Sequence, residues 1–136
     1  MMRPSPMWLG AMTILAAGGC HGGPRCATCG MKVDPESAWV SYVMLGPQEV
    51  AFDTPRCAFT ALRRAEGGAW RARFREYYSQ QVKPVDDVRF VTGSDVVGPM
   101  GPDLVPVAAE SAARFARDHN GAPPKSAGQI IEDGLP

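Results

Sequence analysis

The chain has 136 residues, and its 14 lysine and arginine residues balance 14 aspartate and glutamate residues. A formal net charge of zero argues against a nucleic-acid-binding surface and against a polybasic membrane patch. The 15 glycines and 13 prolines predict short elements joined by many turns, whereas an apolar fraction of 45% is too high for a disordered chain. The length suits one modest domain or two very small ones.

Residues 1–20 have the pattern of an export leader. Arg3 supplies a positive charge, and the mostly apolar run over residues 7–17 is too short to cross a bilayer as a stable helix. Small residues then precede Cys20, as in the bacterial lipobox, so we expect lipidation of Cys20; an ordinary signal peptide with an incidental cysteine is the alternative. Residues 21–25 would form a flexible tether. Cysteines in a chain with such a leader indicate an exported protein.

Three sulfur side chains follow within the stretch CATCGM, at Cys26, Cys29 and Met31. Thiolates and thioethers are soft ligands that select Cu(I), zinc or iron–sulfur centres. The thioether favours Cu(I), because zinc prefers cysteine, histidine and carboxylate ligands. Gly30 permits a sharp turn between the second thiol and the thioether. This stretch is therefore the candidate metal site of the chain.

The next segment predicts a β-hairpin. Residues 32–37 are polar and contain a proline, which indicates a loop. Residues 39–45 are rich in β-branched and aromatic side chains and predict a strand. A turn over residues 46–48 leads to residues 49–53, whose alternation of polar and apolar side chains predicts a second, half-buried strand.

Asp53, Thr54 and Pro55 predict the start of a helix, because a capping oxygen precedes a proline in the first turn. The helix should run to about residue 66, where two glycines end it. Helical spacing places its inward side chains at Ala58, Phe59, Leu62 and Ala65.

Cys57 falls in the first turn of this helix, where N–H groups would favour a thiolate. The alternative, which we prefer, is a small buried apolar cysteine, because most lone cysteines pack inertly. If Cys20 is lipidated, Cys26, Cys29 and Cys57 remain. Three thiols in an oxidising compartment cannot all pair internally, so either one is buried or the group does something other than form disulfides.

Residues 73–78 predict a strand in which arginines alternate with covered positions. With no net charge on the chain, these arginines fit a solvated face better than a nucleic-acid surface. Residues 83–87 predict a loop, and residues 88–92 predict another strand.

A weak internal repeat then follows, in which a turn, a short strand and an alanine-rich helix recur in the same order. The second copy has its strand at residues 104–107 and its helix at residues 110–118. The inward side chains of that helix are expected to be Ala112, Ala113, Phe115 and Ala116. Residues 122–136 are rich in proline and glycine and predict a loosely docked tail.

The predicted fold class is α+β, with two small ββαβ-type units packed together after the leader. The first unit would cover residues 26–87 and carry the sulfur motif. The second would cover residues 88–136, including the tail.

Two further side chains are candidate ligands. Met100 lies in a loop framed by glycine and proline, where it either completes the sulfur site or packs on the sheet as a hairpin-tip methionine. His119 at the predicted end of the second helix is expected to cap that helix, in preference to binding metal. The sequence contains no Ser/His/Asp set, paired-carboxylate site or phosphate loop, so we do not expect an enzyme.

With these residues in view, the sequence resembles the NosL family, the copper chaperones of nitrous oxide reductase assembly. The matching segments are the leader and residues 26–31, 52–53, 90–94, 98–101 and 112–121. The resemblance covers residues 26–121, most of the mature chain. It implies two ββαβ units that bind Cu(I) through sulfur ligands.

The resemblance also implies a location and partners. The protein would be periplasmic and lipid-anchored to a bacterial membrane, with the outer membrane preferred over the inner. Its partners would be ABC-type assembly proteins and nitrous oxide reductase, with no role for nucleic acid. We expect Cys29 and Met31 as primary Cu(I) ligands, Cys26 as a third and Met100 as a completion from the second unit. An incomplete site can accept an incoming ligand before it loses one of its own.

Two other functions compete with copper binding. Cys26 and Cys29 could serve an exported thiol–disulfide oxidoreductase, although such enzymes place CxxC at the start of a helix after a strand. Alternatively, a Cys26–Cys29 disulfide could simply close a loop in a structural lipoprotein.

Overall fold

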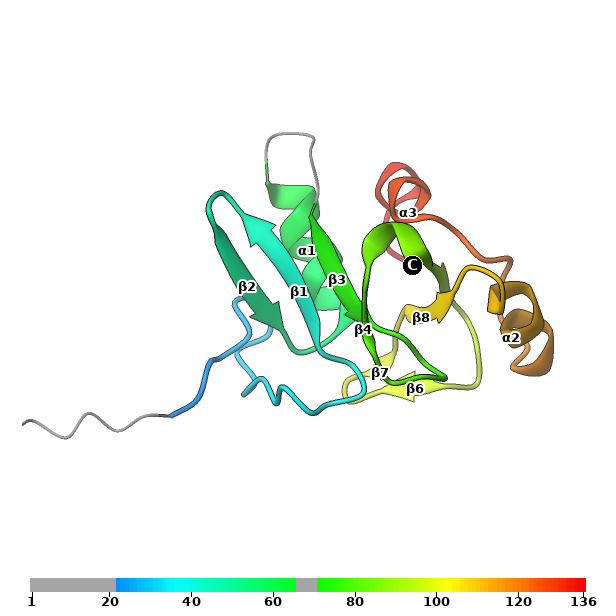
Figure 1. Cartoon of the computed structure of the whole chain (residues 1–136), viewed down its shortest axis with the longest axis horizontal. Coiled ribbons are helices and arrows are strands. Elements are labelled where there is room, and N and C mark those ends of the chain that lie inside the picture. The colour runs from blue at the N-terminus through cyan, green and yellow to red at the C-terminus, as the bar shows by residue number, and fades with distance from the viewer. Residues whose placement is uncertain (1–21, 66–70) are drawn as a thin grey trace, which may run out of the picture.

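The computed structural model of the protein describes residues 22–65 and 71–136 (Figure 1). The predicted leader, with Cys20, lies outside the described residues. So do residues 66–70, at the predicted end of the first helix. In the described part of the chain, no helix has the length and apolar character needed to cross a membrane. Antiparallel strands and helices build the fold, which confirms the predicted α+β class.

A four-stranded antiparallel sheet forms the first half of the structure (Figure 1). Its strand order is β2-β1-β3-β4, with β1 and β2 forming the predicted hairpin. Helix α1 follows β2 and packs on this hairpin. The bounds are β1 Ser41–Leu45, β2 Gln48–Phe52, α1 Pro55–Arg64, β3 Ala72–Arg75 and β4 Val82–Pro84.

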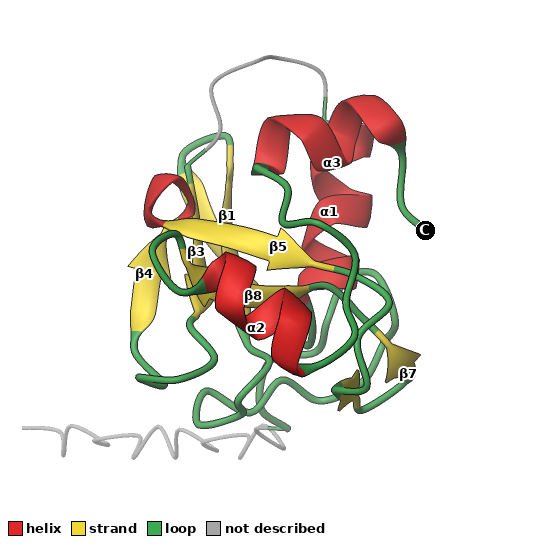
Figure 2. Ribbon diagram, turned by 90° about the vertical axis from the view of Figure 1, so that its right-hand side faces the viewer, coloured by secondary structure: helices red, strands yellow, loops and turns green. Residues whose placement is uncertain are grey.

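The second half is built around the antiparallel pair of β5 and β8. A small hairpin of β6 and β7 extends between them, and a short 3-10 helix, η1, leads into β5. Helix α2 contacts both β5 and β8, and α3 also contacts β5 (Figure 2). The bounds are η1 Val85–Asp87, β5 Val88–Val91, β6 Val97–Gly98, β7 Gly101–Pro102, β8 Val105–Ala108, α2 Ala112–Asp118 and α3 Ala127–Asp133.

The two halves share one connectivity. In the first half, β1 pairs with β2 on one side and with β3, which follows the helix, on the other. In the second half, β5 pairs with β8, and after α2 the backbone of Lys125 exchanges two hydrogen bonds with Phe90 of β5. This single bridge takes the place that β3 has in the first half. The predicted order of strand, strand and helix is thus found in both halves.

The start of α1 is as predicted. The Thr54 hydroxyl accepts a hydrogen bond from the Cys57 N–H, and Pro55 opens the helix. Ala58, Phe59 and Leu62 are buried as expected. The prediction of an inward Ala65 is wrong, because α1 ends at Arg64 and Ala65 leaves the helix in an extended conformation as an exposed C-cap.

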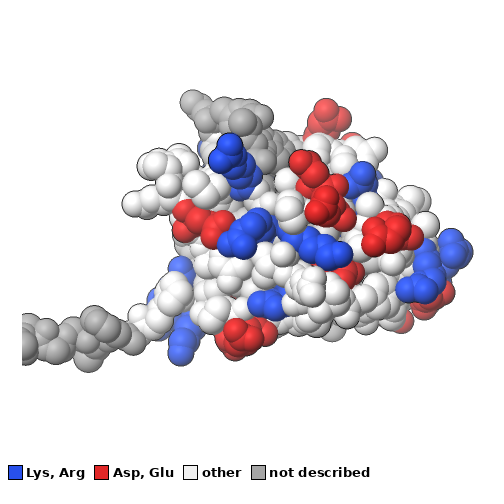
Figure 3. Space-filling model, viewed as in Figure 1, with Lys and Arg blue, Asp and Glu red and all other residues white. Residues whose placement is uncertain are grey.

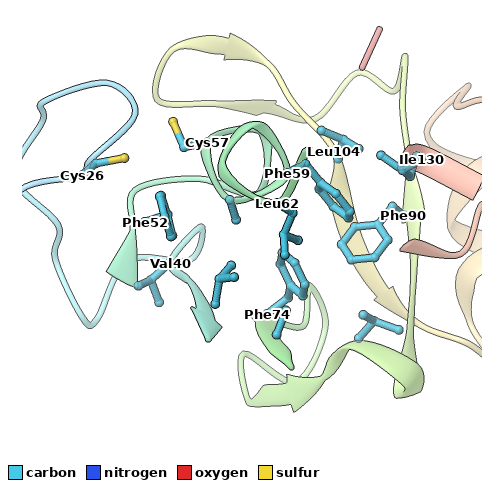
Figure 4. Close-up of a cluster of buried hydrophobic side chains, with 14 of the residues drawn as sticks. Cys26, Val40, Phe52, Cys57, Phe59, Leu62, Phe74, Phe90, Leu104 and Ile130 are labelled. Atoms are coloured by element: carbon cyan, nitrogen blue, oxygen red, sulfur yellow. The ribbon is translucent and has the colours of Figure 1, made fainter. Parts of the chain in front are cut away.

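Three phenylalanines join the two halves in one core (Figure 4). Phe59 from α1, Phe74 from β3 and Phe90 from β5 have ring centroids 4.8–5.6 Å apart. Edge and stacked contacts at these distances add about 0.5–1.5 kcal/mol per pair to the stabilisation from burial. The sheet of the first half and the strand pair of the second are therefore packed against each other rather than only linked.

A smaller apolar cluster lies under α2. Ala112, Phe115 and Ala116 are buried there, as predicted. Ala113 is exposed, against prediction, because the side of α2 that carries Ala112, Phe115 and Ala116 faces the core and position 113 lies off that side.

The predicted strand over residues 73–78 is shorter than expected, since β3 ends at Arg75 and a turn leads back to β4. Its alternation is nevertheless as predicted, with Ala72 and Phe74 buried and Arg73 exposed. Arg73 forms an ion pair with Glu49 across the sheet, at 2.6 Å. Basic and acidic side chains are interspersed over the face of the molecule shown in Figure 3, which is typical of a solvated charged surface.

The prediction of a loosely docked tail is wrong. Residues 127–133 form α3, which begins with a capping box between Ser126 and Gln129. Ile130 is only 2% exposed and belongs to the main core. The capping pattern was present in the sequence, but the prolines before it and the few apolar residues concealed a helix of seven residues.

The docking of α3 can be tested at its one buried side chain. We expect Ile130→Ala to lower the free energy of unfolding by about 2–4 kcal/mol, because it leaves a cavity in the core. Urea unfolding followed by circular dichroism would measure this loss. The matched control is Ile131→Ala on the same helix, where a partly exposed side chain should cost clearly less. Equal and small losses at both positions would contradict the docking.

Candidate metal centre

The sulfur motif lies in a tight loop that precedes β1. Arg25 and Lys32 form a β-bridge, and below it the Cys26 N–H donates to the Met31 carbonyl at 2.8 Å. The Gly30 N–H donates a hydrogen bond to the Cys26 carbonyl, also at 2.8 Å. Gly30 has φ +77°, a conformation that glycine adopts without strain, so it makes the predicted turn between Cys29 and Met31.

One hydrogen bond ties this loop to α1. The Thr28 hydroxyl donates to the Cys57 carbonyl at 2.9 Å, across 29 residues of sequence. Cys57 lies in the first turn of α1, as predicted. The loop and the helix start are thereby brought together, although neither contains a sequence signal for the other.

Three cysteine sulfurs converge at this contact. The Sγ atoms of Cys26, Cys29 and Cys57 all lie within 4.8 Å of one another, and all three thiols are free. Figure 4 shows the side chains of Cys26 and Cys57 directed toward each other. The preferred expectation for Cys57, burial, is confirmed at 2% exposure. Its neighbours, however, include two further thiols, so simple apolar packing does not describe its environment.

The protein environment treats the two buried thiols differently. Burial raises the pKa of Cys26, but N–H groups, first that of Asp53, outweigh burial and bring the pKa below the ordinary value. Burial raises the pKa of Cys57 to about 12, and the charge on Cys26 adds to this shift. The surroundings therefore ease deprotonation of Cys26 relative to an ordinary cysteine and keep the Cys57 thiol protonated. A metal bound by all three sulfurs would displace the Cys57 proton.

The two methionines predicted as ligands lie on the surface. Met31 is 43% exposed and Met100 is 47% exposed. Met100 lies at the turn of the β6–β7 hairpin, as expected for a hairpin-tip methionine, but its exposure shows that it does not pack on the sheet. The base of that hairpin is bound to the first turn of α1, because the Arg56 N–H donates to the Asp103 carboxylate at 2.9 Å. The hairpin is thus attached beside Cys57, and a ligand role for Met31 and Met100 stays a prediction.

Comparison with protein-family models matches residues 20–133 to the NosL model. The chain belongs to the NosL family. No curated protein and no solved structure matches the chain. NosL is a family of copper-binding accessory proteins, and a cluster of three cysteines fits metal binding. The family expected from the sequence is confirmed, and with it a copper-related accessory function.

The arrangement of the NosL chain argues against the thiol–disulfide oxidoreductase alternative. Such enzymes carry CxxC at the first turn of a helix that follows a strand. Here Cys26 and Cys29 lie in a loop ahead of β1, and the cysteine in a first helical turn is Cys57. Because all three of these cysteines are free thiols, the structure also does not contain the Cys26–Cys29 disulfide that the structural-lipoprotein alternative requires.

His119 lies where the sequence placed it, as the C-cap of α2. Its Nδ1 atom lies 2.8 Å from the Asp95 carboxylate, and its ring stacks on Phe115 with centroids 4.3 Å apart. These contacts account for the position of the ring without a metal.

The Thr28–Cys57 hydrogen bond gives a test of how the cluster is held. Thr28→Val keeps the side-chain shape but removes this bond, so copper affinity should fall about tenfold, the scale seen when a partner that orients a ligand is lost. Copper competition titration would measure the change. The control is Thr60→Val, which removes a similar 2.9 Å bond to the Arg56 carbonyl on the same helix. If both variants bind copper equally well, the bond does not position the cluster.

Proposed function

We propose that this NosL protein is a periplasmic Cu(I) chaperone that supplies copper for the assembly of nitrous oxide reductase. The observation that carries the proposal is the convergence of three free thiols within 4.8 Å in a chain of this family. Sulfur ligands select soft metal ions, and Cu(I) is the softest ion that a copper-associated family would be expected to carry. Copper is the cargo of the protein, and no substrate bond is broken.

In this proposal the ligand set combines thiolates and thioethers. Cys26, Cys29 and Cys57 supply thiolates from the loop and α1. Met31 and Met100, both exposed, would supply the thioethers. Cu(I) accepts two or three ligands, so the site need not use all five sulfurs at once. A partly filled coordination shell permits direct transfer to an acceptor without release of free copper.

The proposed location and partners follow from family membership and from the leader. Lipidation at Cys20 would anchor the chain to a bacterial membrane, preferably the outer membrane, through the tether over residues 21–25. An ABC-type assembly complex and the reductase itself would receive the copper. A copper-deficient reductase in cells that lack this protein, restored by the wild-type chain but not by its cysteine variants, would support these partners.

The metal assignment is tested by anaerobic titration of the chain with Cu(I) and Zn(II) against chromogenic chelators. We expect one Cu(I) per chain and no displacement of Cu(I) by zinc. Cys29→Ser and Met31→Ala should both weaken copper binding, because each removes a proposed ligand. Met44→Ala is the matched control, since Met44 lies in β1 and is not a proposed ligand. Effective competition by zinc, or unchanged copper binding in both ligand variants, would refute the assignment.

A further inference from the structure

We infer that copper enters and leaves through Cys29, while Cys26 and Cys57 form a retaining pair that holds the ion between transfers. This inference rests on the proposed copper-chaperone function and concerns the direction from which an acceptor reaches the site. It is drawn from differences in burial, packing and backbone constraint among the three thiols.

The first difference is burial. Cys26 and Cys57 are each 2% exposed and belong to the main core, among side chains such as Phe52 and Phe59. Cys29 is partly exposed and only packs against the edge of that core. An acceptor ligand in solution can therefore meet the metal on the Cys29 side without disturbing the core, whereas the other two sulfurs are covered by it.

The second difference is backbone constraint. Cys57 is held within α1, and the N–H and carbonyl of Cys26 both take part in hydrogen bonds that close the loop. Cys29 lies in the turn that follows Cys26, next to Gly30. A Cβ atom added at Gly30 would meet no atom within 4 Å from residues other than its two chain neighbours, so the rest of the protein leaves the surface at Gly30 uncovered. Cys29 can move away from the metal at small cost, and the retaining pair cannot.

These differences set the order of ligand exchange. An acceptor thiol first forms a sulfur–copper bond on the open side, and the bond from copper to Cys29 then breaks. The proton of the acceptor thiol passes to the departing Cys29 thiolate, and copper stays monovalent throughout. The acceptor must therefore present a soft ligand on a protruding segment that reaches the loop beside Gly30. Further acceptor ligands then replace Cys26 and Cys57.

The first experiment measures access without copper. In the full chain with Cys20→Ser, which leaves three thiols, alkylation by iodoacetamide would be followed by peptide mass spectrometry under native conditions. We expect Cys29 to react about tenfold or more faster than the other two, because buried thiols react only after local opening. If thiolate character alone decided the order, Cys26 would react first, and that result would overturn the inference.

The second experiment measures copper transfer from the copper-loaded chain with Cys20→Ser to glutathione as the acceptor. The absorbance of the copper-loaded protein is followed over time. In the parent chain the transfer rate should rise linearly with glutathione concentration. Cys29→Ser, which removes the ligand that has to leave, should raise the slope of transfer rate against glutathione concentration by about tenfold or more, whereas Cys57→Ala should mainly raise the glutathione-independent loss of copper. An unchanged slope in Cys29→Ser, or the increase of slope in Cys57→Ala instead, would overturn the inference.

The two proposals can fail separately. A parent chain that takes up no Cu(I) would refute the chaperone function. A chain that binds Cu(I) but transfers it independently of Cys29 would refute only the exchange route. If Cys29→Ser cannot be loaded with copper at all, the alkylation order alone decides, since that measurement needs no metal.

Discussion

The apparent copper affinity should rise about a thousandfold between pH 6 and pH 9 through Cys57 alone. Burial holds the pKa of this thiol at about 12, so it is protonated throughout this range in the metal-free protein. Copper binding must then release its proton, and each proton released changes the apparent binding constant about tenfold per pH unit. The sign is fixed by competition, because a higher proton concentration opposes metal binding.

The measurement is a series of anaerobic Cu(I) competition titrations over this pH range. Cys57→Ala should lower the slope of log affinity against pH by about one, because one proton fewer is released. A melting curve of the metal-free variant controls for folding, and alanine suits this site because it is small and apolar. An unchanged slope in Cys57→Ala would mean that Cys57 does not bind the metal.

The largest loss of stability is expected at Glu76. This side chain is 2% exposed, and its carboxylate accepts N–H groups of Tyr78, Ser79 and Ala108 at 2.7–3.2 Å. It therefore links the turn after β3 to the end of β8. We expect Glu76→Ala to lower the free energy of unfolding by about 3–5 kcal/mol, since it leaves the buried N–H of Ala108 and two part-buried N–H groups without their acceptor. Urea unfolding would measure the loss.

The same residue predicts a pH dependence of folding. Burial alone would raise the pKa of Glu76, but the N–H groups of Ser79, Tyr78 and Ala108 lower it below the ordinary value. A carboxyl with a depressed folded-state pKa contributes its full stability above its unfolded pKa of about 4.3 and loses it as the pH falls through the folded value. The free energy of unfolding should therefore decrease as the pH is lowered below about 4.5, and this decrease should be smaller in Glu76→Gln.

Glu49→Gln is the matched control for Glu76→Gln. Glu49 is exposed and pairs with Arg73 on the surface, so Glu49→Gln should lower the free energy of unfolding by at most about 1 kcal/mol. If Glu76→Gln and Glu49→Gln lower the free energy of unfolding equally, the buried carboxylate of Glu76 does not link the two halves as described.

Local features of the fold could be predicted from the sequence because their causes are local. The Thr54 cap and Pro55 define the start of α1, and alternation of side chains defines the β1–β2 hairpin. Gly30 likewise marked the turn inside the sulfur motif. The last helix was missed although its capping box is also local, because its stability depends on a single buried side chain, Ile130, whose docking surface is formed by distant residues.

The candidate site shows the same limit more clearly. Cys26 and Cys29 were identifiable from their spacing, but the third thiol reaches them only through tertiary structure. The contact from Thr28 to Cys57 joins residues far apart in sequence, and no periodicity or spacing relates them. The odd number of thiols that remains if Cys20 is lipidated was the signal in the sequence that pointed beyond the motif.

Two of the three thiols belong to the same packed interior that joins the sheet to α1. Copper binding and folding are therefore thermodynamically linked. Each tenfold excess of copper over its dissociation constant adds about 1.4 kcal/mol to the stability of the loaded form. Under copper starvation the empty protein would open more often to proteases and turn over faster. Its abundance in the cell would then follow the supply of the metal, without any dedicated sensor.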